Sequence, residues 1–257
     1  MRLASYNILD GGEGRADPIA EVLLAQRADI VGLVEADNPA ALERIAARLR
    51  MDYVVASGES HAVALLSRWR IGDTVNHAAI RSGGPRCLLS AEVQPPRAEP
   101  WRVGVVHLSP RAYDADECRR EMEIAALLDV FAPDRGRRRP HILMGDFNAN
   151  APCQRIDPAR CKERTRQAWA ANGGGIPRRV IQRMLEAGYV DTLQAARPAE
   201  AETAGSFTTQ HPGQRVDYIF VHGINPSSIR DAWIEHDRLA KYASDHFPVG
   251  AEVEAGG

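Results

Sequence analysis

Residues 142–149 read Ile-Leu-Met-Gly-Asp-Phe-Asn-Ala, an apolar run that ends in two polar side chains. The apolar part does not alternate with polar residues, which predicts a strand over 141–146 covered on both faces. Residues 30–34, Ile-Val-Gly-Leu-Val, have the same character. A strand with two buried faces needs a layer on each side of its sheet. We therefore expect a sheet packed on a sheet, with helices on the outside.

Strand-like and helical segments alternate along the rest of the chain. Between residues 53 and 107 the strands follow one another closely with turn residues between them, which is typical of antiparallel sheet. A helix is expected over 18–27, with Asp17 as its N-cap and Pro18 at its first position. The other predicted strands are 3–7, 30–35, 53–56, 62–67, 75–80, 87–93, 102–107, 216–221, 229–234 and 249–253, and the other predicted helices are 38–49, 116–131 and 178–187.

The composition is that of a globular protein with a full core. Hydrophobic side chains make up 44% of the 257 residues and the net charge is −2. The beginning of the chain does not suit a signal peptide, and no stretch reaches the ~20 apolar residues of a membrane span. We expect one domain over residues 1–257, a cytoplasmic monomer without a membrane span. The balanced charge gives no overall attraction to nucleic acid, so such a preference has to be local.

Polar side chains stand at the ends of several predicted strands, where groups on a layered fold can converge. Asn7, Glu35 and His107 each end one strand. Asp146 and Asn148 are two residues apart, so an extended backbone would point both side chains the same way. That spacing suits a shared phosphate or metal ion.

Two more polar groups lie near the C-terminal strands. Asp217 begins one apolar strand, and Asp245 and His246 come just before the last one. Because Asp245 and His246 are neighbours, both reach one cleft only if the backbone between them is irregular. The histidines outside these segments belong to no motif, and we expect surface or turn positions for His61, His77, His141, His211 and His222.

Six segments together resemble the endonuclease/exonuclease/phosphatase superfamily of metal-dependent phosphoesterases. They occur in the family's order and extend over nearly the whole chain: 5–7, 34–36, 106–108, 145–149, 216–220 and 244–249. The resemblance implies a four-layered α/β sandwich, in which two mainly antiparallel β-sheets pack face to face and are flanked by helices. It also implies a site at the rim where the six segments meet.

Carried over segment by segment, the resemblance implies a metal site. Asn7 and Glu35 would hold a divalent ion, and such hard oxygen ligands favour Mg²⁺ or Mn²⁺ over zinc. Asp245 would bind a second metal or support His107. His107 matches the second histidine of the deoxyribonuclease-like branch, so the apurinic-endonuclease branch fits less well.

The same resemblance implies a catalytic set. Asp146 would orient or deprotonate the attacking water, and Asn148 would steady the phosphate or the nucleophile. His246 would be the catalytic imidazole, and Asp217 would fix its tautomer. A carboxylate beside His246 should favour the imidazolium, which could stabilise a phosphorane-like oxyanion or protonate a leaving group.

The function that this implies is a divalent-metal-dependent phosphoester hydrolase, nuclease-like, with DNA or another nucleic acid as the expected substrate. The alternatives are a phosphatase or phosphodiesterase for a small phosphorylated metabolite or lipid headgroup, and a catalytically silent binding protein. Residues 151–183 hold eight Lys or Arg against two acidic residues, which suits a polyanion, although a solvated helix explains this charge equally well. Arg111 is the candidate for contact with a substrate phosphate.

Overall fold

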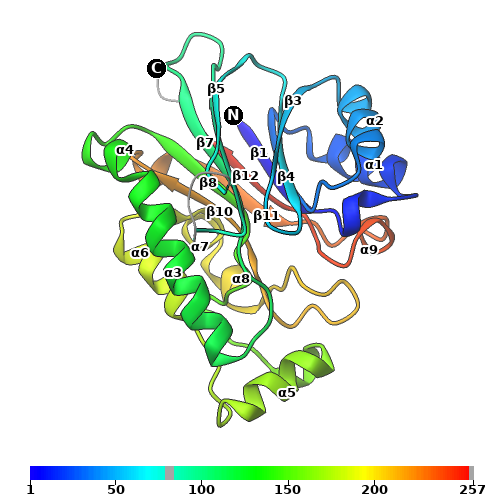
Figure 1. Ribbon diagram of the computed structural model, residues 1–257, viewed down its shortest axis with the longest axis vertical. Coiled ribbons are helices and arrows are strands. Elements are labelled where there is room, and N and C mark those ends of the chain that lie inside the picture. Colours follow the sequence, from blue (N-terminus) through cyan, green and yellow to red (C-terminus); the bar gives the residue numbers. More distant parts are fainter. Residues whose placement is uncertain (79–83, 255–257) are drawn as a thin grey trace.

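The computed structural model describes residues 1–78 and 84–254. Two six-stranded sheets lie face to face and helices cover their outer sides, which confirms the predicted α/β sandwich (Figure 1). None of the helices in the described part is long and apolar enough to cross a membrane.

The first sheet has the strand order β11-β12-β1-β2-β4-β3. Only β1 and β2 run parallel, and the other neighbours are antiparallel. Every residue of β2 and of β4 is buried, as expected for strands with cover on both faces. The strands are β1 (Arg2–Asn7), β2 (Ile30–Val34), β3 (Asp52–Ser57), β4 (Ala62–Ser67), β11 (Ile229–Ile234) and β12 (Val249–Val253).

The second sheet has the order β5-β6-β7-β8-β10-β9, and only β7 and β8 run parallel. Its register is decisive for the site, because Asp146 pairs with His107 on one side and with Asp217 on the other. His107, Asp146 and Asp217 therefore lie side by side in one row at the ends of neighbouring strands. The strands are β5 (Ile71–Asn76), β6 (Cys87–Val93), β7 (Trp101–His107), β8 (His141–Asp146), β9 (Val190–Asp191) and β10 (Asp217–His222).

Gly145 allows this row to form. Its φ is +143°, and a Cβ atom there would lie 2.0 Å from the carbonyl oxygen of Val106. Only glycine combines that backbone conformation with such a close approach of the neighbouring strand. The residue before Asp146 therefore sets the spacing between β7 and β8.

Helices α1 and α2 pack on each other over the first sheet, and α3 and α6 pack on each other over the second (Figure 1). Helix α5 lies apart from both sheets, at the lower end of the view. The helices are α1 (Ala16–Gln26), α2 (Pro39–Leu49), α3 (Asp114–Val130), α4 (Ala132–Gly136), α5 (Glu163–Ala171), α6 (Arg179–Glu186), α7 (Thr192–Ala196), α8 (Pro198–Thr203) and α9 (Ala240–Ala243).

The beginning of α1 differs from the prediction. The helix starts at Ala16 with Arg15 as its N-cap, so Asp17 is not the cap. Asp17 lies in the first turn, where a carboxylate suits the helix dipole, and it pairs with Arg44 of α2. The ion pair between Asp17 and Arg44 is consistent with a helix that starts at Ala16, two residues before Pro18.

Two further predictions need correction. The strand predicted over 75–80 is β5 and ends at Asn76, and the predicted positions 79 and 80 lie outside the described residues. His141 is fully buried and not at the surface. Its ring stacks between Phe131 and His222, and its Nε2 lies 2.8 Å from the hydroxyl of Tyr189, so an aromatic layer covers it.

Candidate active site

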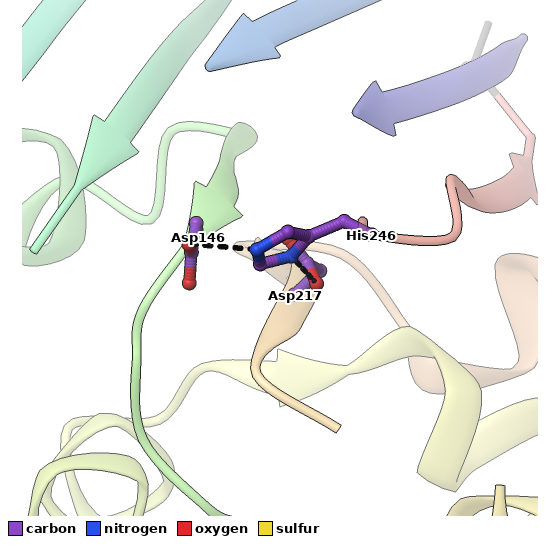
Figure 2. Close-up of side chains that lie close together, drawn as sticks. All are labelled: Asp146, Asp217 and His246. Atoms are coloured by element: carbon purple, nitrogen blue, oxygen red, sulfur yellow. Dashed lines mark hydrogen bonds and ion pairs between the residues drawn. The ribbon is translucent and has the colours of Figure 1, made fainter. Parts of the chain in front are cut away.

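Three predicted catalytic residues meet where the strand ends of the second sheet approach the first. Asp146 ends β8, Asp217 begins β10, and His246 lies just before β12 (Figure 2). Each offers one atom, and these atoms lie within 4.8 Å of one another. The His246 ring points its Nδ1 at Asp217, 2.9 Å away, and its Nε2 toward Asp146, 3.8 Å away. The three side chains are buried.

Ser206 holds Asp217 in this position. Its hydroxyl donates to Oδ2 of Asp217 at 2.7 Å and accepts the backbone N–H groups of Val216 and Asp217. The carboxylate facing Nδ1 fixes the ring orientation of His246, because Nδ1 then carries the proton. Sequence reasoning missed Ser206, since a serine in a loop carries no periodic signal.

The charges in this cluster are strongly coupled. Burial alone would lower the pKa of His246, but the carboxylates, Asp217 first and then Asp146 and Asp245, raise it to about 10. Burial, reinforced by repulsion from Asp217, raises the pKa of Asp146 to about 7. The carboxylates therefore favour the imidazolium form of His246, whereas burial and the neighbouring Asp217 favour the neutral form of Asp146.

Asn7 and Glu35 adjoin this cluster from the first sheet. The amide Nδ2 of Asn7 donates to Glu35 at 3.2 Å and to Asp146 at 3.1 Å, and the amide oxygen accepts the N–H of Leu9. Glu35 has φ +59°, which turns the chain directly after β2, and its second oxygen accepts the N–H of Asp10. Two of the predicted metal ligands, Asn7 and Glu35, thus touch each other, and Asn7 also touches the carboxylate of Asp146.

His107 also borders Asp146, with its Nε2 3.8 Å from Oδ2. Burial lowers its pKa well below 6.5, so the ring is neutral. Its Nδ1 has no hydrogen-bond partner among the described residues. The ring of His61 lies 5.6 Å from that of His107, and His61 is itself paired with Asp37.

The other predicted site residues lie at the margin of the cluster. Asn148 has φ +48°, so the expected extended backbone from Asp146 is wrong, and its amide donates to the carbonyl of Leu108. Asp245 is 4.0 Å from Nε2 of His246. The side chain of Arg111 is exposed and lines a cavity beside Asn148.

The chain bends at Asp245, between Ser244 and His246. This is the irregular backbone that allows Asp245 and His246 to approach the same site. The hydroxyl of Ser244 donates to the carbonyl of Asn7 at 2.6 Å and accepts the N–H of His246. This serine therefore ties the loop before β12 to the end of β1. The connection places His246 opposite Asn7.

The donor set fits a hard divalent cation. Asp146, Asp217 and His246 form the buried group at its centre, and Asp245 and Glu35 adjoin this group through His246 and Asn7. Oδ1 of Asp217 and Oδ1 of Asp245 are buried without a hydrogen-bond partner in the described part of the chain. Carboxylates that outnumber the one facing cation, with two of them buried, favour a bound cation with oxygen ligands.

Ion pairs reduce the charge of residues 151–183. Five of its cations are engaged locally, with acidic side chains or, for Arg178, with backbone carbonyls: Arg155, Arg166, Arg178, Arg179 and Arg183. Within the described ranges, Arg160, Lys162 and Arg164 form no ion pair. Lys162 and Arg164 line the cavity beside Asn148. The positive charges of Lys162 and Arg164, which form no ion pair, thus lie next to the cluster of Asp146, Asp217 and His246.

Comparisons with known proteins agree with this geometry. The sequence profile described as the Endonuclease/Exonuclease/phosphatase family matches residues 4–246, whereas no curated protein matches. A 3′ phosphatase from Neisseria, solved with a product DNA hairpin, is 23% identical with a TM-score of 0.73 over 99% of both chains. An AP endonuclease from Archaeoglobus fulgidus is 20% identical with a TM-score of 0.69 over 99% of both chains. The chain belongs to the Endonuclease/Exonuclease/phosphatase family.

Proposed function

We propose that the protein is a divalent-metal-dependent phosphodiesterase that hydrolyses nucleic acid, with Mg²⁺ or Mn²⁺ as its metal. The observation that carries this proposal is the buried cluster of Asp146, Asp217 and His246 against Asn7 and Glu35. It combines an acidic cation site with an imidazolium. Those are the groups that a phosphoryl-transfer reaction needs, because charge develops on the phosphate oxygens.

Each side chain has a defined part in the mechanism. Glu35 and Asn7 would hold the metal together with Asp146, and a bound metal supplies Lewis-acid stabilisation of the phosphate. Asp146, whose pKa burial raises to about 7 in the metal-free protein, is the group that would accept a proton from water. His246 stabilises the developing negative charge as an imidazolium, and Asp217 keeps it charged and oriented. These roles are proposals.

Cavities border the cluster through different residues, which supports a diester with groups beyond the reacting phosphate. One of about 180 Å³ includes Asn148 in its wall, and a more open depression of about 540 Å³ includes Asp245. Both include Lys162. A substrate that continues from the phosphate in two directions could occupy both. The DNA hairpin of the Neisseria neighbour supports the same substrate class.

The unpaired cations of residues 151–183 provide a test of the substrate class. Lys162→Glu with Arg164→Glu should weaken binding of an oligonucleotide and lower the salt slope by ~0.7 for each lost contact to a single strand. The matched control is Arg137→Glu with Arg138→Glu, two exposed cations beyond α4 at the other end of the molecule (Figure 1). Equal effects of both pairs would contradict a nucleic-acid path over α5.

A substrate screen tests the proposal directly. Single- and double-stranded DNA, RNA, and small mono- and diesters are incubated with Mg²⁺, Mn²⁺ or chelator. The proposal expects cleavage of a nucleic acid with metal and none with chelator. Faster hydrolysis of small phosphorylated metabolites than of any nucleic acid would favour the alternative of a small-molecule phosphatase. No hydrolysis of any substrate would favour a binding protein.

A further inference from the structure

A cavity of about 180 Å³ lies beside the catalytic cluster, between the loop that follows β7 and helix α5. Its wall reaches the cluster at Phe207, whose ring centroid lies 4.6 Å from that of His246. We call this cavity the side pocket and define it by wall residues from three segments: Tyr113, Lys162, Arg164, Trp169, Phe207 and Gln214. A group attached to a phosphate at His246 is within reach of it.

The side pocket has aromatic walls and a cationic margin. Tyr113, Trp169 and Phe207 come from different segments and line one space. The ammonium of Lys162 lies 5.5 Å from the centroid of the Phe207 ring, and Arg164 lines the same cavity. Aromatic rings stack on planar heterocycles, and cations attract the attached phosphate. The pocket therefore suits a ring that carries a phosphate.

The wall also contains polar groups without partners. Nε1 of Trp169, Oδ1 of Asn150 and Oε1 of Gln214 have no hydrogen-bond partner in the part of the chain that the structure describes. All three residues line the side pocket and are more than nine-tenths buried. Buried polar groups ordinarily have partners. A heterocycle with both N–H groups and acceptor atoms would supply such partners once the wall shifts slightly, because the three atoms themselves are almost fully covered, whereas a hydrocarbon ring would not.

The size of the side pocket limits the ligand. Its volume of about 180 Å³ slightly exceeds that of a ~150 Å³ cavity that accepts benzene. One ring system fits this space, and a pair of stacked bases does not. A base that enters has to leave its stack, as in a flipped or terminal nucleotide.

We propose that the side pocket receives one unstacked nucleobase of the nucleotide whose phosphate reacts, stacked on Trp169 and Tyr113. This inference rests on the proposed function, because it assumes that the phosphate belongs to a nucleotide. It adds that one base outside a duplex is bound together with that phosphate.

Binding of two matched ligands tests the pocket without turnover. Adenosine 5′-monophosphate and ribose 5-phosphate carry the same phosphate, so the ratio of their dissociation constants, measured by calorimetry in Mg²⁺ and in chelator, reports the base alone. We expect the nucleotide to bind ~10- to 100-fold more tightly, the range of one base–aromatic stack. A ratio within twofold of one would overturn the proposal.

Variants then assign the preference to the side pocket. Trp169→Ala should reduce the ratio severalfold, and so should Tyr113→Ala at a more exposed position. Trp169→Phe keeps an aromatic ring but loses the N–H, so it should reduce the ratio less than Trp169→Ala. The control is Trp233→Phe, an indole on β11 outside the side pocket that bonds Gln26. An unchanged ratio in both alanine variants would overturn the proposal.

Hydrolysis separates this inference from the proposed function. The proposed function fails if no divalent cation supports cleavage of any nucleic acid, whatever the binding ratio. The side pocket fails if the two ligands bind equally, even when cleavage of nucleic acid is observed. The two failures are therefore read from different measurements on the same protein.

Discussion

Asp217→Asn removes the carboxylate that faces His246 and leaves the shape of the side chain nearly unchanged. Oδ2 of Asp217 lies 2.9 Å from Nδ1 of the ring, and both residues are buried. In the wild type, burial lowers the pKa of His246, and the surrounding carboxylates, with Asp217 the strongest, raise it from 6.5 to about 10. The net rise corresponds to roughly 5 kcal/mol in favour of the imidazolium.

The sign of the effect on stability follows from the raised pKa. The contribution of the imidazolium to the free energy of unfolding is fully present below pH 6.5 and is lost as the pH rises to about 10. In Asp217→Asn, burial still disfavours the positive charge of His246, but the carboxylate that stabilises this charge most strongly is gone. We therefore expect the pKa of His246 to fall, so that the ring is neutral at a pH where the wild type is charged.

The assay is a titration of the imidazole resonances by NMR on metal-free protein, followed by urea unfolding at pH 6.5 and pH 9. Asp231→Asn is the control, because that exposed carboxylate pairs with Arg197 outside the cluster. It should leave the His246 titration unchanged. A wild-type His246 that titrates near 6.5, or an Asp217→Asn variant with an unchanged pKa, would refute this account of the pair.

Two further substitutions test the support of the site. Ser206→Ala should lower the free energy of unfolding by ~1–3 kcal/mol in a urea titration, because Asp217 and two backbone N–H groups lose a buried partner; a change below ~0.5 kcal/mol would argue against this role. Arg215→Met should cost ~3–5 kcal/mol, because the buried Asp191 loses its ion pair at 2.8 Å. Double substitution of Arg215 and Asp191 by apolar residues should recover part of that loss, and no recovery would contradict the charge explanation.

The row of candidate site residues could be predicted because polar residues follow the ends of apolar strands there. The apolar strands end at polar residues, and the sheet register then brings His107, Asp146 and Asp217 side by side. The layered fold follows from unbroken apolar strands such as 30–34. The prediction from the sequence agrees with the structure where a strand is buried on both faces, because such a strand fits few positions in a layered fold.

The surroundings of the site could not be predicted in the same way. Ser206, Phe207 and Gln214 lie in a loop without periodicity, and α5 buries only Thr165, Ala168 and Trp169, so its polar sequence shows no clear apolar face. The excess of basic residues over 151–183 follows from the sequence, but the number of basic residues does not reveal which cations form ion pairs. The single domain, the monomer, the cytoplasmic location and the individual catalytic roles stay predictions.

The left-handed backbone conformation of Asn148 shows why the direction of its side chain could not be predicted from the sequence. The alternation of side chains along a strand holds only while the backbone stays extended, and Asn148 has φ +48° just after β8. Asparagine tolerates this conformation better than most residues. The same residue type is therefore compatible with both geometries, and in the structure its side-chain amide donates to the carbonyl of Leu108 while its backbone N–H donates to Oδ1 of Asp146.

A metal titration of nuclease activity tests the central claim most directly. Wild type, Glu35→Gln and the control Glu43→Gln, an exposed position on α2, are assayed on one oligonucleotide from chelator to high Mg²⁺. We expect no cleavage in chelator and a half-saturating Mg²⁺ concentration at least ~10-fold higher for Glu35→Gln than for the other two proteins. Full cleavage in chelator, or identical Mg²⁺ curves for all three, would contradict it.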